Sequence, residues 1–285
     1  MSYRTLLAIL SLLGMMLNHP AAEAARVVKE IFLEKPFDHS AWDEFLKKYV
    51  NEAGEVDYDG IKEDPAMLET YETQLRGFNI NEFKTWPREE RLALLLNAYH
   101  VGIIRVAIDH YPIKSIQDIP GVWDAQLIKI GNSDVAFSLN RLRYQELIQT
   151  FGDEKIHLAL SCGAQGCPRM KREAFDGPRV EGQLFIAANE FVNNETFNRV
   201  DREKKILWLA PIFQWYGDDF FLDFGSGEPL AQRTQQESAI ISFVAYYLND
   251  AKSVEFLEAN DFKIKYFVFD WSLNDGSRSS EKDVG

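Results

Sequence analysis

The chain has 285 residues, of which 46% are hydrophobic and 26% charged, so it contains enough apolar sequence for a full-sized core. This composition excludes a disordered tail, a coiled-coil rod and a low-complexity linker. Acidic residues outnumber basic residues by 44 to 31, which gives a net charge of -13. Because such a charge repels polyphosphate, we expect no nucleic-acid partner.

The first residues have the pattern of a signal peptide. Arg4 precedes an apolar run over residues 6–17, and Ala22-Glu23-Ala24 fits a cleavage site. The run is shorter than the about 20 residues that a helix needs to span hydrocarbon. We therefore expect cleavage near Ala24 and export to the periplasm or the medium, with no membrane span in the mature chain.

The remaining chain divides by pattern into three parts. Residues 25–84 are expected to form a helical N-terminal extension, with one helix beginning at Ser40 and another over residues 66–76 that ends at Gly77. Residues 85–275 form the expected core domain, and the polar residues 276–285 a disordered tail.

A long helix is expected in the centre of the core domain. From residue 92 to 108 the sequence LALLLNAYHVGIIRVAI is apolar almost all round, which indicates a helix enclosed by other elements. Asn97 and His100 interrupt this run and share a face, because they are three positions apart. Two interpretations stay open: the pair enters an interior binding pocket, or both side chains bond to nearby backbone.

Short strands and helices follow in irregular order. The pattern predicts a hairpin over residues 126–137, helices over 138–151, 179–193 and 235–249, and strands over 156–161, near 199, and over 206–209 and 263–269. Because the hairpin breaks a steady βαβ alternation, we predict an α+β fold. It is a single globular domain with a mainly antiparallel or mixed sheet around a buried central helix.

Four ordered motifs resemble the segments of the family catalogued as domain of unknown function 547. They read LLLNAYHVGIIRVAIDHYPIKSI, HLALSCGAQGCPRM, APIFQWYGDDF and FVFDWSLN, and the likeness covers about residues 85–275. The family has no settled activity, so the resemblance implies a topology and candidate positions but no reaction. These positions are Asn97, His157, Cys162, Gly163, Gly166, Cys167, Pro168, Trp215, Asp219, Asp270, Trp271 and Asn274.

The chain departs from the family pattern in two places. His100 stands where the family tends to have asparagine, and Ser161 to Ala164 stand where it tends to read NCGS. The first departure weakens His100 as a base common to the family.

Besides two packed thiols without a functional role, the loop that holds Cys162 and Cys167 has three interpretations. In an exported protein the two thiols can form a disulfide, which would stabilise so small a ring by about 2 kcal/mol. Alternatively, Cys162 is a nucleophile with His157 or His100 as base and Asp270 as its orienting carboxylate. Strand alternation places His157 and Cys162 on opposite faces, so this arrangement needs a sharp turn between them.

A zinc site built from both cysteines and a histidine is the third interpretation. The C-x4-C spacing is compatible with zinc, but the sequence offers no second compact ligand pair. We therefore assign no metal and no cofactor.

Aromatic and polar residues of the last two motifs are candidate binding residues. Trp215, Tyr216 and Asp219 combine aromatic rings with a carboxylate, which suits sugars or amines, and a packed aromatic corner explains the rings equally well. Trp271 and Asn274 are further candidate binding residues. Turn chemistry likewise explains Asp270 and Asn274.

Two functional hypotheses follow. The first is an exported thiol-dependent hydrolase or acyl/amide transferase that acts on a small or peptide-like substrate, with Asn97 as a polar support in the pocket. The second is a non-enzymatic module that binds a small ligand or a protein, with its loop held by a Cys162–Cys167 disulfide. The sequence identifies no protein partner.

Overall fold

A computed structural model describes residues 36–225 and 228–277. The chain divides into two compact units, residues 1–38 and His39–Gly285, and all the described helices and strands belong to the second. The signal-peptide prediction lies outside the described residues, as does most of the tail, residues 278–285.

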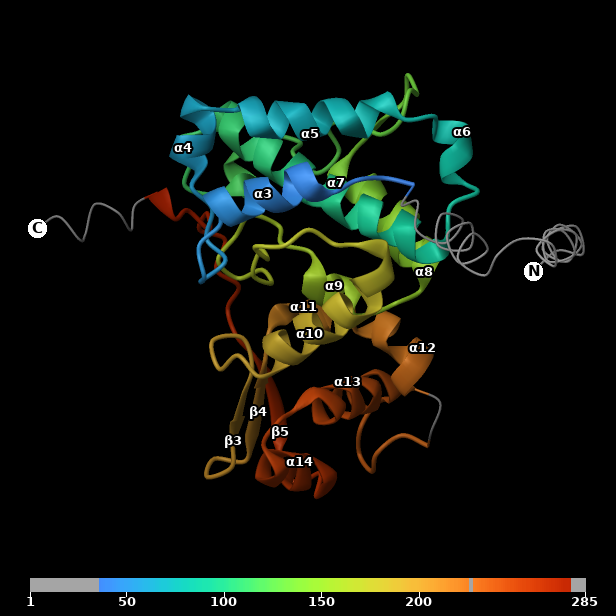
Figure 1. Cartoon of the computed structure of the whole chain (residues 1–285). Coiled ribbons are helices and arrows are strands. Elements are labelled where there is room, and N and C mark those ends of the chain that lie inside the picture. Colours follow the sequence, from blue (N-terminus) through green and yellow to red (C-terminus); the bar gives the residue numbers. More distant parts are fainter. Residues whose placement is uncertain (1–35, 226–227, 278–285) are drawn as a thin grey trace, which may run out of the picture. The chain divides into compact units, whose positions relative to one another are not determined.

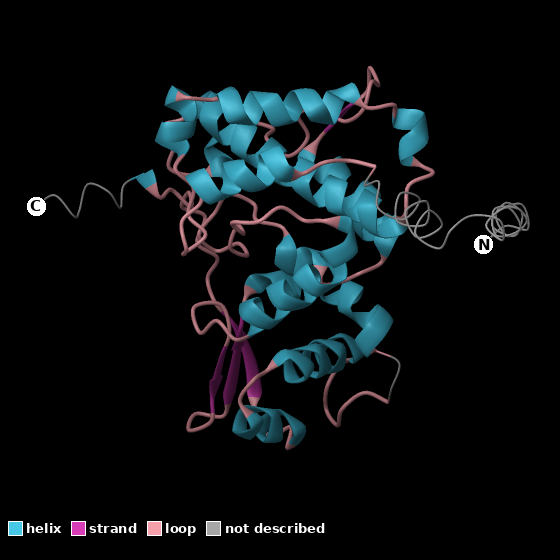
Figure 2. Cartoon of the chain, in the orientation of Figure 1, coloured by secondary structure: helices cyan, strands magenta, loops and turns pink. Residues whose placement is uncertain are grey.

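The described residues are mainly helical, with one two-stranded and one three-stranded sheet (Figure 2). Here α marks α-helices and η marks 3-10 or π-helical segments. The elements are α3 (Ser40–Tyr49), α4 (Tyr58–Glu63), α5 (Ala66–Gly77), α6 (Ile80–Phe83), α7 (Arg88–His110), η1 (Ile116–Asp118), β1 (Ile128–Lys129), β2 (Ala136–Phe137), η2 (Arg141–Ile148), α8 (Gln149–Phe151), α9 (Ile156–Ala159), η3 (Gly177–Arg179), α10 (Val180–Val192), β3 (Arg199–Asp201), β4 (Ile206–Leu209), α11 (Pro211–Trp215), η4 (Gly217–Phe220), α12 (Phe221–Phe224), α13 (Gln235–Tyr247), α14 (Ala251–Glu258) and β5 (Lys263–Tyr266).

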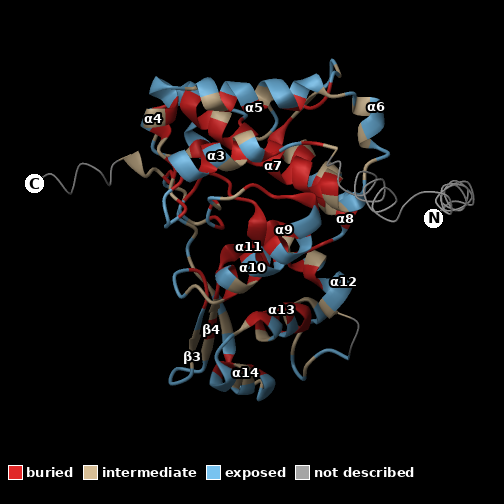
Figure 3. Cartoon of the chain, viewed as in Figure 1, coloured by how far each residue is buried: buried red, intermediate tan, exposed pale blue. Residues whose placement is uncertain are grey.

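Helix α7 is the buried central helix that the sequence predicts. Pro87 precedes its first turn, Glu89 and Glu90 lie at its positive end, and nearly every residue from Leu92 to Ile108 is buried (Figure 3). Among the described helices, α7 alone is long and apolar enough to cross a membrane, and 89% of its most apolar stretch is buried inside the fold. This burial accounts for its composition.

The helices of the N-terminal extension pack with α7 in the same unit. Contacts join α3 to α5, and both α4 and α5 to α7 (Figure 1). At their centre the ring of Trp42 stacks on Phe45 with centroids 4.8 Å apart and on Tyr71 at 5.3 Å. These stacked rings are fully buried and contribute apolar area to a common core.

The three-stranded sheet is mixed and forms a second core with the C-terminal helices. β3 pairs antiparallel with β4, and β4 pairs parallel with β5. Leu207 and Leu209 of β4 point into a buried cluster that also contains Phe213, Phe243 of α13 and Leu257 of α14. The predicted α+β fold with a mixed sheet is confirmed.

The strand predicted over residues 156–161 is wrong, because this segment begins as helix α9. Asp153 accepts a hydrogen bond from the Lys155 amide at 2.9 Å, and the Asp153 carbonyl accepts one from Ile156. These bonds close a helical turn immediately after Gly152, which adopts the left-handed region at φ 59° and ends α8. An apolar run this short fits a buried strand or a buried helix equally well.

Candidate functional site

Cys162 and Cys167 form a disulfide that closes the loop after α9. Their Cα atoms are 5.8 Å apart, and Gly163 between them adopts φ 81°, a conformation that glycine accepts without strain. The chain contains only these two cysteines, so the disulfide occupies both sulfur atoms. In this state Cys162 has no thiolate to act as a nucleophile.

The fourth motif holds this loop from the other side. The amides of Gln165 and Gly166 donate to the carbonyls of Ser272 and Asp270, each at 2.8 Å, and Ala164 forms an antiparallel bridge with Leu273. A Cβ atom at Gly166 would lie 2.9 Å from the Asp270 amide nitrogen. The close backbone approach therefore requires glycine at this position.

His100 of α7 fixes the start of the same loop. Its Nε2 atom accepts a hydrogen bond from the Ser161 amide at 3.0 Å, and its side chain is buried. Burial lowers the pKa of His100 to about 4, so the imidazole is neutral at pH 7. His100 thus acts as a backbone anchor beside Cys162.

Asn97 occupies the same kind of position one turn earlier on α7. Its Oδ1 accepts from the Phe175 amide at 3.0 Å, and its Nδ2 donates to the Phe175 carbonyl at 2.9 Å and contacts Nδ1 of His39 at 3.2 Å. The fully buried amide therefore binds backbone of the segment before α10. Of the two interpretations of Asn97 and His100, the structure supports bonds to nearby backbone.

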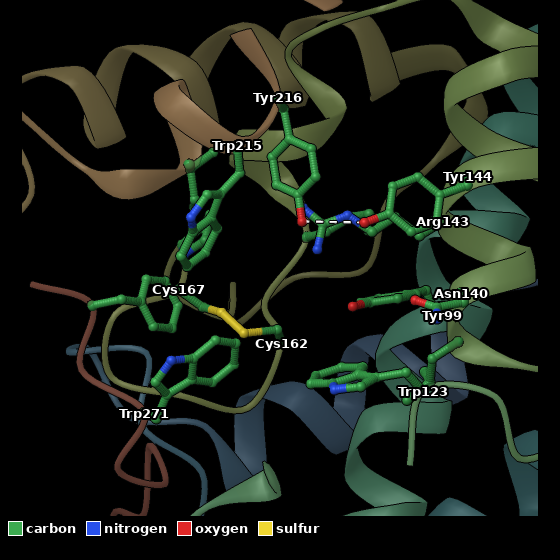
Figure 4. Close-up of a pocket in the computed structure, with 15 residues that line it drawn as sticks. Tyr99, Trp123, Asn140, Arg143, Tyr144, Cys162, Cys167, Trp215, Tyr216 and Trp271 are labelled. Atoms are coloured by element: carbon green, nitrogen blue, oxygen red, sulfur yellow. Dashed lines mark hydrogen bonds between the residues drawn. A yellow bond between two sulfur atoms is a disulfide. The ribbon is translucent and has the colours of Figure 1, made fainter. Parts of the chain in front are cut away.

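A cavity of about 270 Å³ lies directly beside the disulfide (Figure 4). Its walls are mainly apolar, with aromatic rings as nearly half of the lining residues, and they come from all four sequence motifs and from two segments between the first and second motifs. The lining residues are Tyr99, Trp123, Leu139, Asn140, Arg143, Tyr144, Leu160, Cys162, Cys167, Pro168, Ile212, Trp215, Tyr216, Phe269 and Trp271. Both tryptophans that the sequence proposes for binding, Trp215 and Trp271, thus face this cavity, with ring centroids 6.1 Å apart.

The cavity's polar wall comes from the π-helical segment η2. A π-helix of this length is rare, and such segments concentrate at functional sites. Asn140, Arg143 and Tyr144 all line the cavity from η2 and the residue before it. The guanidinium of Arg143 lies 4.4 Å from the centre of the Tyr216 ring, and the hydroxyls of Tyr144 and Tyr216 are 3.3 Å apart.

His157 lies behind this wall and is bonded to Asp219. Arginine can only donate, so Nδ1 of His157, 3.4 Å from Nη2 of Arg143, is the acceptor. The ring proton is then on Nε2, which donates to Oδ2 of Asp219 at 2.8 Å. Burial lowers the pKa of His157, and the neighbouring Arg143 charge lowers it further, whereas the bond to Asp219 opposes both effects.

Asp270 and Asn274 do not join this histidine. Asp270 is exposed, and its Oδ1 accepts hydrogen bonds from the amide and hydroxyl of Ser272. Oδ1 of Asn274 accepts from the Tyr58 hydroxyl at 2.7 Å, which ties the fourth motif to α4. The expected Cys162, His157 and Asp270 relay is therefore not assembled in this structure; Asp219 is the carboxylate that bonds to His157.

The sequence reasoning did not identify Arg143, which is the principal polar group of the cavity. A usable signal was present, because Asn140, Arg143 and Tyr144 are spaced to share one helical face. Within residues 36–225 and 228–277, no three histidine, cysteine, aspartate or glutamate side chains are grouped so that they could hold a metal ion.

Comparison with known proteins gives one match. No curated protein and no solved structure is similar to the chain. Residues 83–192 match the family model described as "Protein of unknown function, DUF547". The matched range contains α7, η2 and the disulfide loop, and thus the first two of the four motifs. The match confirms the resemblance over residues 83–192, and it does not extend to the third and fourth motifs.

Proposed function

We propose that the protein is a binding module for a small ligand, and that the ligand occupies the cavity beside the Cys162–Cys167 disulfide. The observation that carries this proposal is the convergence of four sequence-distant motifs on one aromatic hollow. Concave, mainly apolar cavities with a few polar groups are the usual form of a small-molecule site. The disulfide supports the proposal because it holds the wall loop in one conformation, which lowers the entropic cost of binding.

The thiol-dependent hydrolase is the weaker candidate. It needs a free Cys162 thiolate with a base beside it, whereas here both sulfurs are bonded to each other. The hydrogen bonds of the two candidate bases lead elsewhere, from His157 to Arg143 and Asp219 and from His100 to the Ser161 amide. We therefore propose binding rather than catalysis in the oxidised protein.

A matched pair of tryptophan variants tests the site. The probe is N-phenyl-1-naphthylamine, a neutral aromatic dye whose fluorescence rises in apolar surroundings. Trp271→Ala removes a wall of the cavity, whereas Trp208→Ala removes a ring from β4, outside the cavity. Aromatic contacts are worth about 0.5–1.5 kcal/mol beyond their buried area, so we expect Trp271→Ala to weaken dye binding about tenfold or more.

Trp208→Ala should leave the dissociation constant of the dye within about twofold of the wild-type value. Absence of saturable dye binding, or an equal loss in both variants, would contradict the proposed site.

The disulfide gives a second prediction. Replacing both cysteines, as Cys162→Ser with Cys167→Ser, should lower the free energy of unfolding by about 2 kcal/mol in the loop-entropy model. Dye affinity should fall as well, because both cysteines line the cavity. Urea unfolding and dye titration measure the two effects. Unchanged dye affinity in a folded double variant would show that the bridge is not needed to shape the site.

A further inference from the structure

We infer that the ligand of this cavity is a small monoanionic carboxylate with a planar apolar body, and that Arg143 binds its carboxylate. This inference rests on the proposed function and assigns the class of ligand.

Arg143 lacks the carboxylate partner that several other arginines of the described residues have. Arg105 is bonded to Glu72, Arg141 to Glu146 and Arg179 to Asp176. Arg143 forms no ion pair with any aspartate or glutamate of the described residues; it contacts His157 and the rings of Tyr144 and Tyr216, and it shares a side-chain hydrogen bond with Tyr99. Its Nε atom is buried and has no hydrogen-bond partner within the described part of the chain.

A guanidinium without a counter-ion in a half-buried aromatic wall is a site for an anion. Burying a charge without a counter-ion is costly, and an anion bound in the cavity compensates the charge of the guanidinium. The planar fork of arginine matches a carboxylate, to which it can donate two parallel bonds. Tyr216 and Tyr144 flank Arg143 and limit its side-chain freedom, so it is pre-organised for such a pair.

The charge of the cavity sets the charge of its ligand. Among the described residues that line the cavity, Arg143 is the only one with a charged side chain. Asp219 does not line the cavity and bonds to His157. One positive charge balances one negative charge, which favours a carboxylate over a phosphoryl dianion. The neutral His157 adds no second positive charge.

The walls set the shape of the ligand body. Trp215 and Trp271 lie on one side of the cavity, and Trp123 lies on the other side of the disulfide (Figure 4). The Arg143 side chain lies next to Tyr144. Ring faces favour stacking with flat apolar groups. A cavity of about 270 Å³ admits a molecule of one or two fused rings with its carboxylate directed at Arg143.

Competition against N-phenyl-1-naphthylamine tests the inference. The competitors are 2-naphthoate and 2-naphthamide, which have nearly the same shape and differ in charge. We expect 2-naphthoate to displace the dye from the wild-type protein at a concentration about tenfold lower, a difference of about 1.4 kcal/mol. In Arg143→Gln the two competitors should displace the dye at concentrations equal within about twofold.

Arg141→Gln is the matched control. Arg141 lies on the same π-helical segment but pairs with Glu146 over the Phe137 ring, outside the cavity. This variant should keep the wild-type preference for 2-naphthoate. Arg143→Lys keeps the charge and loses the planar fork, so its preference should fall between those of the wild type and Arg143→Gln. It also decides the question if Arg143→Gln fails to fold.

Three other outcomes would each contradict a specific proposal. If the dye binds and Trp271→Ala weakens it, but the two competitors are equal in the wild type, the carboxylate inference fails and the binding site stands. If 2-naphthyl phosphate displaces the dye at a lower concentration than 2-naphthoate, the ligand class is phosphoryl and the inference is wrong. If the dye shows no saturable binding, the proposed function fails as well.

Discussion

Asn97→Ala lowers the free energy of unfolding by about 3 kcal/mol, because it leaves a buried amide and a buried carbonyl without partners. Both groups belong to Phe175 and are bonded to the Asn97 side chain at 3.0 and 2.9 Å. The segment that contains Phe175 leads into η3 and α10, so the substitution also removes hydrogen bonds that link α7 to the start of these helices. Urea unfolding followed by circular dichroism measures the change.

Asn81→Ala serves as the control for Asn97. Asn81 lies exposed on α6, and exposed substitutions of this kind change the free energy of unfolding by about 0.5 kcal/mol or less. Equal stabilities of the two variants would contradict the anchoring role of Asn97.

His100 should make the protein less stable in acid. Its pKa is about 4 in the folded protein against 6.5 in the unfolded chain, so the unfolded state binds a proton first as the pH falls. The stability that its neutral state contributes is complete above pH 6.5 and is lost as the pH falls through 4. The loss between pH 7 and pH 4 amounts to about 3 kcal/mol at 1.36 kcal/mol per pKa unit.

His100→Gln isolates this effect, because glutamine can accept the Ser161 amide bond and does not titrate. The pH dependence of wild-type stability does not isolate His100, because burial also raises the pKa of Glu154 to about 7. That shift makes the protein more stable as the pH falls from 7 to 4.5, which opposes His100. The difference in unfolding free energy between wild type and His100→Gln should therefore fall by about 3 kcal/mol from pH 7 to pH 4. A difference that does not change with pH would exclude the buried neutral imidazole.

The longer helices, α3, α5, α7, α10 and α13, could be predicted from local pattern. The all-round apolar sequence of α7, and the stop at Gly152 that ends α8, carry their own physical signals. Residues 156–161 could not be assigned in this way, because the Asp153 bonds that start α9 compete with the strand preference of a short apolar run. The π-helical form of η2 also could not be predicted, because the hydrophobic pattern was compared with the 3.6-residue period of an α-helix.

The sequence indicated several residues that line the site but little of the site's chemistry. The four motifs gather beside the sulfur atoms. Of the polar residues that stood out in the sequence, Asn97 and His100 instead bond to backbone amides, and Asn274 bonds to the Tyr58 hydroxyl. Sequence shows that a buried polar group needs a partner, but only tertiary structure shows whether that partner is the protein's own backbone or a ligand. Arg143 was missed for the same reason, because its lack of a carboxylate depends on packing.

The central claim is that the cavity beside the disulfide binds a carboxylate ligand. A crystal structure of the wild-type protein with 2-naphthoate tests it most directly. The account predicts the ring system among Trp123, Trp215 and Trp271, with a carboxylate oxygen within about 3.2 Å of a guanidinium nitrogen of Arg143. A ligand bound elsewhere, or bound in the cavity with its carboxylate turned away from Arg143, would contradict it.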